Sequence, residues 1–193
     1  ENYIKAFGDV KMNQGDTVFM DSKYAEYRGN TKFAFATGNV VMRDPKMTLT
    51  TDTVNFDRRI QQAYYTTYGT IKDQENTLKS KSGRYYLDQK KFQFLTAVTI
   101  TNPKYVIKSN HLDYYSNSGH SYLFGPSTIT SKENFIYTEK GFYDTKKNFA
   151  HFVKNSYIKY NKRLIEGDSL YYDRNIEVAS ATNNVKITDS ISK

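Results

Sequence analysis

The chain has 193 residues and a formal net charge of +8, with 28 Lys and Arg against 20 Asp and Glu. It contains no Cys, which excludes disulfides, thiolate metal sites and Cys nucleophiles. Its 18 Tyr and 12 Phe supply bulk for a core and favour strands, and no stretch is long and apolar enough for a membrane-spanning helix.

The excess of basic residues is moderate and has two interpretations. A positive surface attracts anions such as nucleic acid, anionic lipid or phosphorylated glycolipid. It is equally compatible with simple solubility. The chain begins at Glu1 without a signal peptide, so we expect a mature form trimmed of its targeting segment.

Two kinds of extended segment alternate along the chain, and both recur at nearly the same spacing. The first kind ends in an apolar residue every 29 or 30 residues, at Met12, Met42, Ile71, Ile100, Ile129, Ile158 and Ile187. The second kind ends in an aromatic cluster and covers 18–27, 49–57, 78–86, 107–115, 136–144 and 165–173. Two series with a common period indicate an internal repeat of about 29 residues.

Each segment has the pattern of a strand, and Gly, Pro, Asn and Asp mark the turns between segments. In the first kind, apolar residues such as Ala36, Val40 and Met42 share one face at period 2, as in a half-buried strand. In the second kind the alternation slips by one residue, because Leu49 has one parity and Val54 the other. That slip predicts a bulge or a corner within each aromatic segment.

No segment sustains the 3.6-residue period of a helix, and no linker interrupts the repeat. The sequence therefore predicts a single all-β repeat domain over residues 1–193, an elongated antiparallel stack of about 13 bent strands. Pro126 lies inside one of these strands and indicates a further bulge or a missing ladder bond. The first and last segments are half-repeats and should present open strand edges.

Two neighbouring segments carry a resemblance to a known family. Residues 36–42 read Ala-Thr-Gly-Asn-Val-Val-Met, and residues 49–57 read Leu-Thr-Thr-Asp-Thr-Val-Asn-Phe-Asp. They resemble the OstA-like family, whose sequences tend to read A-x-G-N-V, a turn, then L-x-A-D-x-L-x-Y-D. A second copy stands at 165–173, Ile-Glu-Gly-Asp-Ser-Leu-Tyr-Tyr-Asp. The richness in Tyr, Lys and Asn suggests a divergent branch, of the kind expected in Bacteroidetes.

The resemblance implies a specific fold and role. The family, which includes LptA, LptC and the N-terminal domain of LptD, forms a V-shaped or β-jellyroll stack of antiparallel strands with an apolar interior. Its members lie in the periplasm of Gram-negative bacteria and lead to the outer membrane. They stack edge to edge with each other or with copies of themselves, and acyl chains of lipopolysaccharide slide inside the trough. No cofactor and no transmembrane segment is implied for this chain.

Two sets of residues are candidates for a lipid-binding site. The inner face would be lined by apolar residues of the first kind of segment, or these residues would form an ordinary core: Met12, Ala36, Val40, Met42, Ile71, Phe94, Val98, Ile100, Leu123, Ile129, Phe152 and Ile158. Basic residues after the aromatic clusters would form a rim that meets lipid phosphates or anionic sugars, or would be solvated turns: Arg58, Arg59, Lys90, Lys91, Lys146 and Lys147.

No arrangement of residues indicates catalysis. A polar series recurs with the repeat, which favours a structural role at the corner over acid/base chemistry: Asp21, Asp52, Lys81, Asn110, Glu139 and Asp168. His111, His120 and His151 fall at unrelated repeat positions and have no zinc-site spacing. The aromatic residues follow the core periodicity and the basic residues lie in turns, so nucleic acid is not the expected partner.

Two alternatives to a lipid-binding protein remain open. A structural β-solenoid or adhesin-like interaction module without lipid cargo would show a fixed repeat as well. A polysaccharide lyase on a β-helix would need catalytic residues that break the repeat on an exposed face, and the sequence offers none.

Overall fold

The computed structural model describes residues 2–14, 18–132, 134–160, 162–176 and 178–189. Residues 1–96 and residues 97–193 form two compact units, called unit 1 and unit 2 below. The expectation of a single repeat domain stays a prediction.

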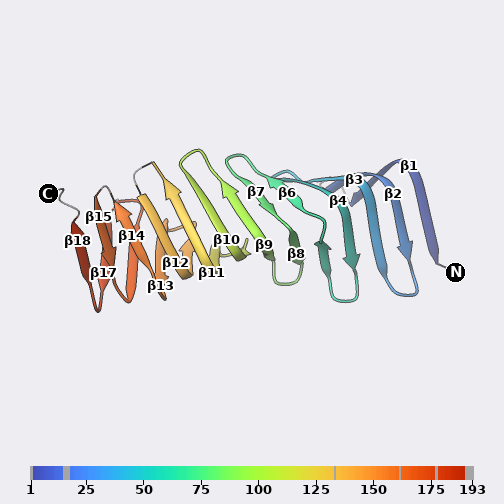
Figure 1. Ribbon diagram of the computed structural model, residues 1–193. Helices are drawn as coiled ribbons and strands as arrows, with labels where there is room; N and C mark the ends of the chain where they lie inside the picture. Colours follow the sequence, from blue (N-terminus) through green and yellow to red (C-terminus); the bar gives the residue numbers. More distant parts are fainter. Residues whose placement is uncertain (1, 15–17, 133, 161, 177, 190–193) are drawn as a thin grey trace. The chain divides into compact units, whose positions relative to one another are not determined.

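The described residues form antiparallel strands joined mostly by tight turns, and no helix occurs among them (Figure 1). Unit 1 holds β1 (Tyr3–Gln14), β2 (Val18–Arg28), β3 (Phe33–Arg43), β4 (Thr48–Asp57), β5 (Gln62–Tyr65), β6 (Gly69–Lys72), β7 (Thr77–Ser80), β8 (Ser82–Tyr86) and the first part of β9 (Lys91–Thr101). Unit 2 continues with β10 (Tyr105–Tyr115), β11 (His120–Ser131), β12 (Asn134–Asp144), β13 (Phe149–Val153), β14 (Tyr157–Tyr160), β15 (Arg163–Glu166), β16 (Ser169–Asp173), β17 (Val178–Thr182) and β18 (Lys186–Asp189).

These 18 strands correspond to the 13 segments expected from the sequence. Eight segments are single strands, and five are interrupted near their middle, as the pairs β5/β6, β7/β8, β13/β14, β15/β16 and β17/β18. The all-β antiparallel fold is therefore confirmed. The difference in strand number has one physical origin, which is the corner in each segment.

The corner is an unequal bulge in which two residues of one strand oppose one residue of its neighbour. Between β3 and β4 the pairing jumps from Thr37 with Thr53 to Val40 with Thr51. The two extra residues, Gly38 and Asn39, have φ angles of 82° and 56°. Gly and Asn adopt this left-handed conformation at low cost, so the Gly-Asn pair turns the strand without breaking it.

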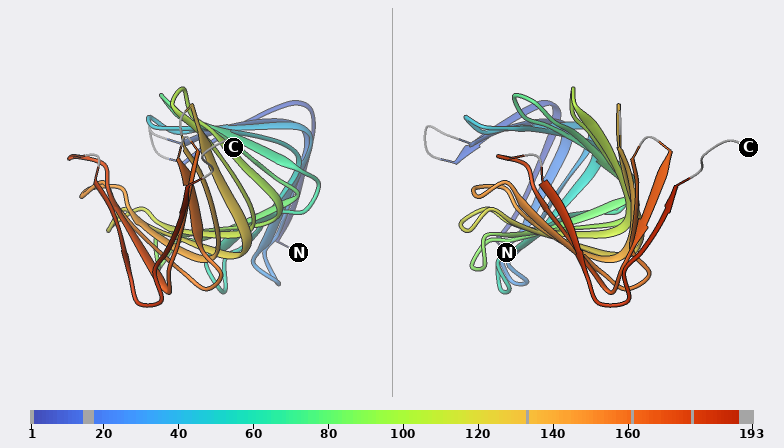
Figure 2. Two further views of the ribbon diagram at one scale, coloured as in Figure 1. Left: turned by 60° about the vertical axis from the view of Figure 1, so that its left-hand side comes forward. Right: turned by 90° about the vertical axis from the view of Figure 1, so that its left-hand side faces the viewer.

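The corner recurs with the repeat. Left-handed backbone also occurs at Tyr68, Ala97, Asn155 and Asn184, which are the positions 29 residues apart that correspond to Asn39. The register shift predicted from Pro126 is confirmed, since pairing jumps between Phe124 and Ser127 in β11. In unit 2 the bend is visible as a V formed by the orange and red strands (Figure 2).

Buried hydroxyl groups replace the ladder hydrogen bonds that each corner removes. The residue before the single bulged position is Ser or Thr in five repeats, and all five are buried: Ser22, Thr51, Ser80, Ser109 and Thr138. The Thr138 hydroxyl lies 2.9 Å from the carbonyl oxygen of Lys140 and 2.8 Å from Ser156 Oγ. It also accepts the N–H of Lys140 at 3.2 Å. The hydroxyl thus satisfies backbone N–H and carbonyl groups that the corner leaves unpaired.

The core lies on the inner side of the corners. Within it, a large side chain on one strand lies beside a small residue on the neighbouring strand. Val10, Ala25, Ala36, Val40 and Val54 form a core cluster in unit 1, and Ile136, Ala150, Phe152, Ile158 and Leu170 form one in unit 2. Large rings face glycines across the sheet, as Phe94 pairs with Gly83 and Phe152 pairs with Gly141. Tyr65 also pairs with Gly83, where an added Cβ would overlap the ring. Such complementarity is typical of a close-packed interior.

One register within the predicted repeat is wrong. Asp21 was expected at the corner, but it pairs with Val41 in the regular ladder and bonds to Arg43. The corner position is held by Lys23, because the bulge lies between Asp21 and Tyr24. The first aromatic segment therefore begins its repeat at Met20 and not at Val18. Met20 pairs with Met42, and so does Leu49, the first residue of the next aromatic segment. Met20 and Leu49 are 29 residues apart, as in the later repeats.

Replacing Thr138 by Val should remove the hydroxyl while keeping the shape of the side chain. We expect the unfolding free energy to fall by about 1–3 kcal/mol, because the Lys140 N–H and carbonyl lose a buried partner. Denaturant unfolding measures this. The control is Thr130→Val on the exposed face of the neighbouring strand, which should change stability by less than about 0.5 kcal/mol. Equal effects of both variants would contradict the role given to the corner hydroxyl.

Candidate functional site

A continuous row of apolar side chains runs across each unit on the inner face of one wing, the wing being the part of the strands on one side of the corner. In unit 1 the residues are paired strand to strand in the order Met12, Met20, Met42, Leu49, Ile71 and Leu78. In unit 2 the order is Ile107, Ile129, Ile136, Ile158, Ile165 and Ile187. These two sets are called the unit 1 row and the unit 2 row. Each is an uninterrupted apolar stripe perpendicular to the strands.

The twelve predicted lining residues fall into two groups by burial. Seven are buried at or next to the corner core, namely Ala36, Val40, Phe94, Val98, Leu123, Phe152 and Ile158. Five keep exposed surface, namely Met12, Met42, Ile71, Ile100 and Ile129, and Met12 is 47% exposed. The buried group has no surface to offer a ligand. The exposed group can contact an apolar molecule without any rearrangement.

The other wing adds a row of aromatic residues that the sequence-based list of lining residues does not contain. Tyr27, Phe56 and Tyr85 in unit 1, and Tyr143 and Tyr172 in unit 2, lie two residues beyond core positions on the same strand face, and all are half-buried. Small residues alternate with them across the sheet, since Ala34 and Ala63 both pair with Phe56. Their 29-residue spacing is the sequence signal that could have identified them as lining residues.

The predicted rim residues lie in or beside the turns at the end of this second wing, in both units, and the charged groups of Arg59, Lys91 and Lys146 have partners within the protein. Arg59 forms an ion pair with Asp57 at 2.7 Å. The ammonium of Lys91 lies 5.6 Å from the ring centre of Tyr86, and Lys146 donates to the carbonyl of Asn117 at 2.6 Å. Lys90 adopts a left-handed backbone, and the Lys147 N–H binds the carboxylate of Asp144 at 3.0 Å. Arg58 is the rim residue whose charge faces an open hollow, lined also by Lys32 and Tyr27.

Successive turns are joined by a ladder of their own. A left-handed residue in one turn directs its carbonyl toward the next repeat, as Lys32 accepts the Arg58 N–H at 3.0 Å. Gly119 accepts the Thr145 N–H at 2.9 Å in the same way. The cationic turns are therefore held at fixed positions within each unit.

Carboxylates at these turns and on the outer face are stabilised in their charged form. The N–H groups of Lys147 and Lys146 bind Asp144 and hold the pKa of its carboxyl below the ordinary value, against the effect of burial. A hydrogen bond from Arg59 lowers the pKa of Asp57 in the same manner. On the outer face the carboxylate of Glu26 accepts from the Tyr24 hydroxyl at 2.7 Å, which raises the pKa of Tyr24 to about 12.

The three histidines lie on the outer face. His111 contacts Asp113 at 2.7 Å, His120 lies 3.6 Å from Asp144, and the ring of His151 stacks on Tyr171. Within the described ranges, no three His, Asp or Glu side chains gather as a metal site would require. The predicted polar residues Glu139 and Asp168 lie at corners, where they bind Asn155 and Asn184. In the part of the chain that the structure describes, there is no helix able to cross a membrane.

Comparison with known protein families shows to which family this chain belongs. The family described as OstA-like protein matches residues 1–110, which is more than half of the chain. The chain belongs to the OstA-like family. Within the OstA-like motif, Gly38 and Asn39 are the left-handed pair at the corner. Asp52 is the single residue opposite them.

Among solved structures, the fold is similar to that of LptH from Pseudomonas aeruginosa, described as the LptA-homologous periplasmic component of the conserved lipopolysaccharide transport device. The sequences are 13% identical, the TM-score is 0.55, and the match covers 60% of this chain and 94% of that chain. At this identity the similarity concerns the fold alone. No curated protein matches the chain.

The carboxylates with lowered pKa predict how stability depends on pH. A carboxyl whose folded pKa lies below its unfolded value stabilises the fold above the unfolded value, and that contribution is lost as the pH falls through the folded value. We therefore expect the denaturation midpoint to be steady between pH 5 and 7 and to fall below about pH 4. Asp144→Asn keeps the hydrogen-bond acceptor and should reduce this acid-dependent fall.

The control for the pH series is Asp88→Asn, which changes an exposed carboxylate in the turn between β8 and β9. It should leave the shape of the pH curve unchanged. An Asp144→Asn curve that parallels the parent protein down to pH 3 would show that this carboxylate does not contribute to acid sensitivity.

Proposed function

We propose that this protein binds the acyl chains of lipopolysaccharide, or a related lipid, on the inner faces of its bent sheets and carries them across the periplasm toward the outer membrane. The observation that carries the proposal is the pair of uninterrupted apolar rows, whose members Met42, Ile71 and Ile129 remain half-exposed. Membership of the OstA-like family and a fold similar to LptH support it.

The chemistry of the rows suits transport better than fixed binding. Burial of acyl methylenes on an apolar face is worth about 0.8 kcal/mol per CH₂ and is non-directional. Neighbouring row positions carry Met, Leu or Ile without polar groups, so a chain can shift along the row without breaking a specific contact. We infer a non-catalytic role, in which the protein supplies a path for the lipid.

The terminal strands fit a partner of the same kind. Among the described ladders, β1 pairs with β2, and β17 and β18 pair with β16 and β15, which leaves one edge of each free. Apolar side chains at these edges are exposed, including Ile4 and Met12 on β1 and Ile187 on β18. We propose that another OstA-like protein, or a second copy, adds a strand at such an edge and extends the apolar row.

A second candidate function is a structural interaction module without lipid cargo. The close packing of the corner, where Val40 and Leu170 have no exposed surface, favours it, because that part of the interior has no room for a ligand. The two candidates differ in whether the half-exposed rows meet a lipid.

A photo-crosslinking residue placed at Ile129 in the purified protein separates the two candidates. With lipopolysaccharide present, we expect an adduct at Ile129 and at Ile71, because both lie in the apolar rows. The matched control is Thr130, which is next in β11 and exposed on the opposite face. Adducts at all three positions would indicate non-specific contact. A folded protein with no adduct at Ile129 or Ile71 would favour the interaction module.

A further inference from the structure

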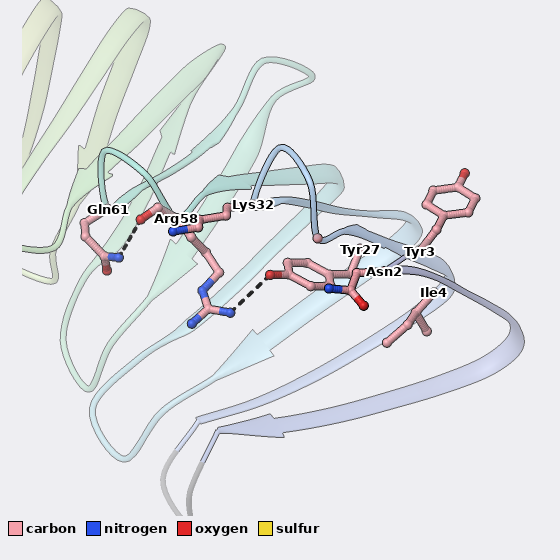
Figure 3. A pocket seen from close by; sticks show the side chains of 8 residues that line it. Asn2, Tyr3, Ile4, Tyr27, Lys32, Arg58 and Gln61 are labelled. Atoms are coloured by element: carbon pink, nitrogen blue, oxygen red, sulfur yellow. Dashed lines mark hydrogen bonds between the residues drawn. The ribbon is translucent and has the colours of Figure 1, made fainter.

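An open hollow of about 680 Å³ lies in unit 1, at the end of the wing that carries the aromatic row (Figure 3). It is bounded by the start of β1, by the turn between β2 and β3, and by the turn between β4 and β5. Its lining includes Ile4, Tyr27, Gly29, Lys32, Arg58 and Gln61. Among the described residues that line it there is no Asp or Glu.

Lys32 and Arg58 both line this hollow, and neither has an acidic partner among the described residues. The ion pairs found among the described residues include neither Lys32 nor Arg58. The adjacent turn residues behave differently, since Arg28 is bound to Glu26 and Arg59 to Asp57. The positive charges of Lys32 and Arg58 are therefore not neutralised by an ion pair among the described residues, whereas those of Arg28 and Arg59 are.

The Arg58 side chain is held in place by neutral groups. Its guanidinium donates to the Tyr27 hydroxyl at 3.4 Å, and its Cζ lies 5.9 Å from the centre of the Tyr27 ring. Its backbone is fixed on both sides, because Arg58 N–H donates to Lys32 and the Gln61 amide donates to the Arg58 carbonyl at 2.7 Å. The Tyr27 hydroxyl keeps its own proton to donate, and the guanidinium keeps further N–H groups.

The wall formed by the N-terminal segment depends on Gly29. The Gly29 N–H donates to the carbonyl of Asn2 at 2.5 Å, and a Cβ on Gly29 would overlap the side chain of Asn2. The absence of a side chain thus lets the start of β1 approach the turn. This brings the apolar side chain of Ile4 to the same hollow as the two cations (Figure 3).

We propose that this hollow binds a phosphate group, either free or as a monoester on an apolar molecule. Two cations match the charge of a phosphate dianion, and the planar guanidinium can bind two of its oxygens at once. The Tyr27 ring and Ile4 offer an apolar surface to the group that carries the phosphate. The anion site stands on its own geometry, and the proposed lipid transport only supplies one source of the ligand, a phosphorylated lipid headgroup. Free phosphate is the other source.

The test is a binding titration by isothermal calorimetry with three probes: inorganic phosphate, a phosphorylated glycolipid in detergent, and the same glycolipid after removal of its phosphates. Arg58→Gln and Lys32→Gln should each weaken binding of a phosphorylated probe about tenfold or more, as expected for loss of a charge-assisted hydrogen bond. Gln is suited to position 32 because Gln61 holds the corresponding left-handed position one repeat later.

Two further variants control for charge and for folding. Lys46→Gln removes one positive charge at an exposed turn between β3 and β4 and should leave affinity unchanged. Arg58→Lys keeps the charge but loses the planar fork, so its affinity should lie between those of the parent protein and Arg58→Gln. All variants are compared at an equal fraction folded, measured by circular dichroism.

Each outcome decides the proposal. Weaker binding of inorganic phosphate by Arg58→Gln supports the site with free phosphate as a ligand, and an effect confined to the phosphorylated glycolipid supports it with the headgroup as the ligand. Affinity that is equal for parent, Arg58→Gln and Lys32→Gln overturns it, as does equal binding of phosphorylated and dephosphorylated glycolipid. Crosslinking at Ile129 would be unaffected in those cases, so lipid binding by the rows is judged separately.

Discussion

The two-against-one corner is the constraint on which the rest of the structure depends. A straight antiparallel sheet would place its two wings in one plane and leave the apolar face in water. The left-handed pair on one strand and the single bulged residue on the next bend both strands at the same place. The buried hydroxyl beside the bulge then satisfies the backbone groups that the bend leaves unpaired. Without this hydroxyl, buried backbone N–H and carbonyl groups at the bend would be left unpaired, which lowers the stability of the fold.

The corner also divides the inner face into parts with different properties. Close to it, Phe152 and Leu170 fill the space between the wings and have little or no exposed surface. Within the rows, Met42, Ile71 and Ile129 stay half-exposed, whereas Leu78, Ile136 and Ile158 are buried. A single apolar face can therefore serve as a core along one line and as a ligand surface along another. The interpretations of core and trough are compatible because the residues that stay half-exposed are not the ones that fill the corner.

Whether a corner can be recognised in the sequence depends on whether the strand contains one or two extra residues there. A single extra residue reverses the alternation, so the slip between Leu49 and Val54 predicted the corner in the aromatic segments. Two extra residues restore it, and Ala36 and Val40 therefore look like positions of one unbroken strand although Gly38 and Asn39 bend it. For the same reason the five interruptions could not be counted from the pattern. Asp21 was misplaced because the first repeat was counted from Val18 and not from Met20.

For the candidate site, periodicity identified which residues face inward but not how exposed they are. Exposure depends on the size of the residue across the sheet, as with Phe94 opposite Gly83, and on distance from the corner. The hollow at Arg58 could not be predicted either, since Lys32 and Arg58 are 26 positions apart and meet through the ladder of turns. The neutralisation of Arg59 by Asp57 likewise depends on local turn geometry.

The most direct test of the central claim is a crystal structure of the protein with a lipid whose acyl chain carries bromine near its end. Anomalous scattering then locates the chain without reference to the protein density. We expect bromine beside the half-exposed residues Met42 and Ile71, or beside Ile129, with the corner core unchanged. Bromine on the outer face, or within the packed corner at Val40, would contradict it.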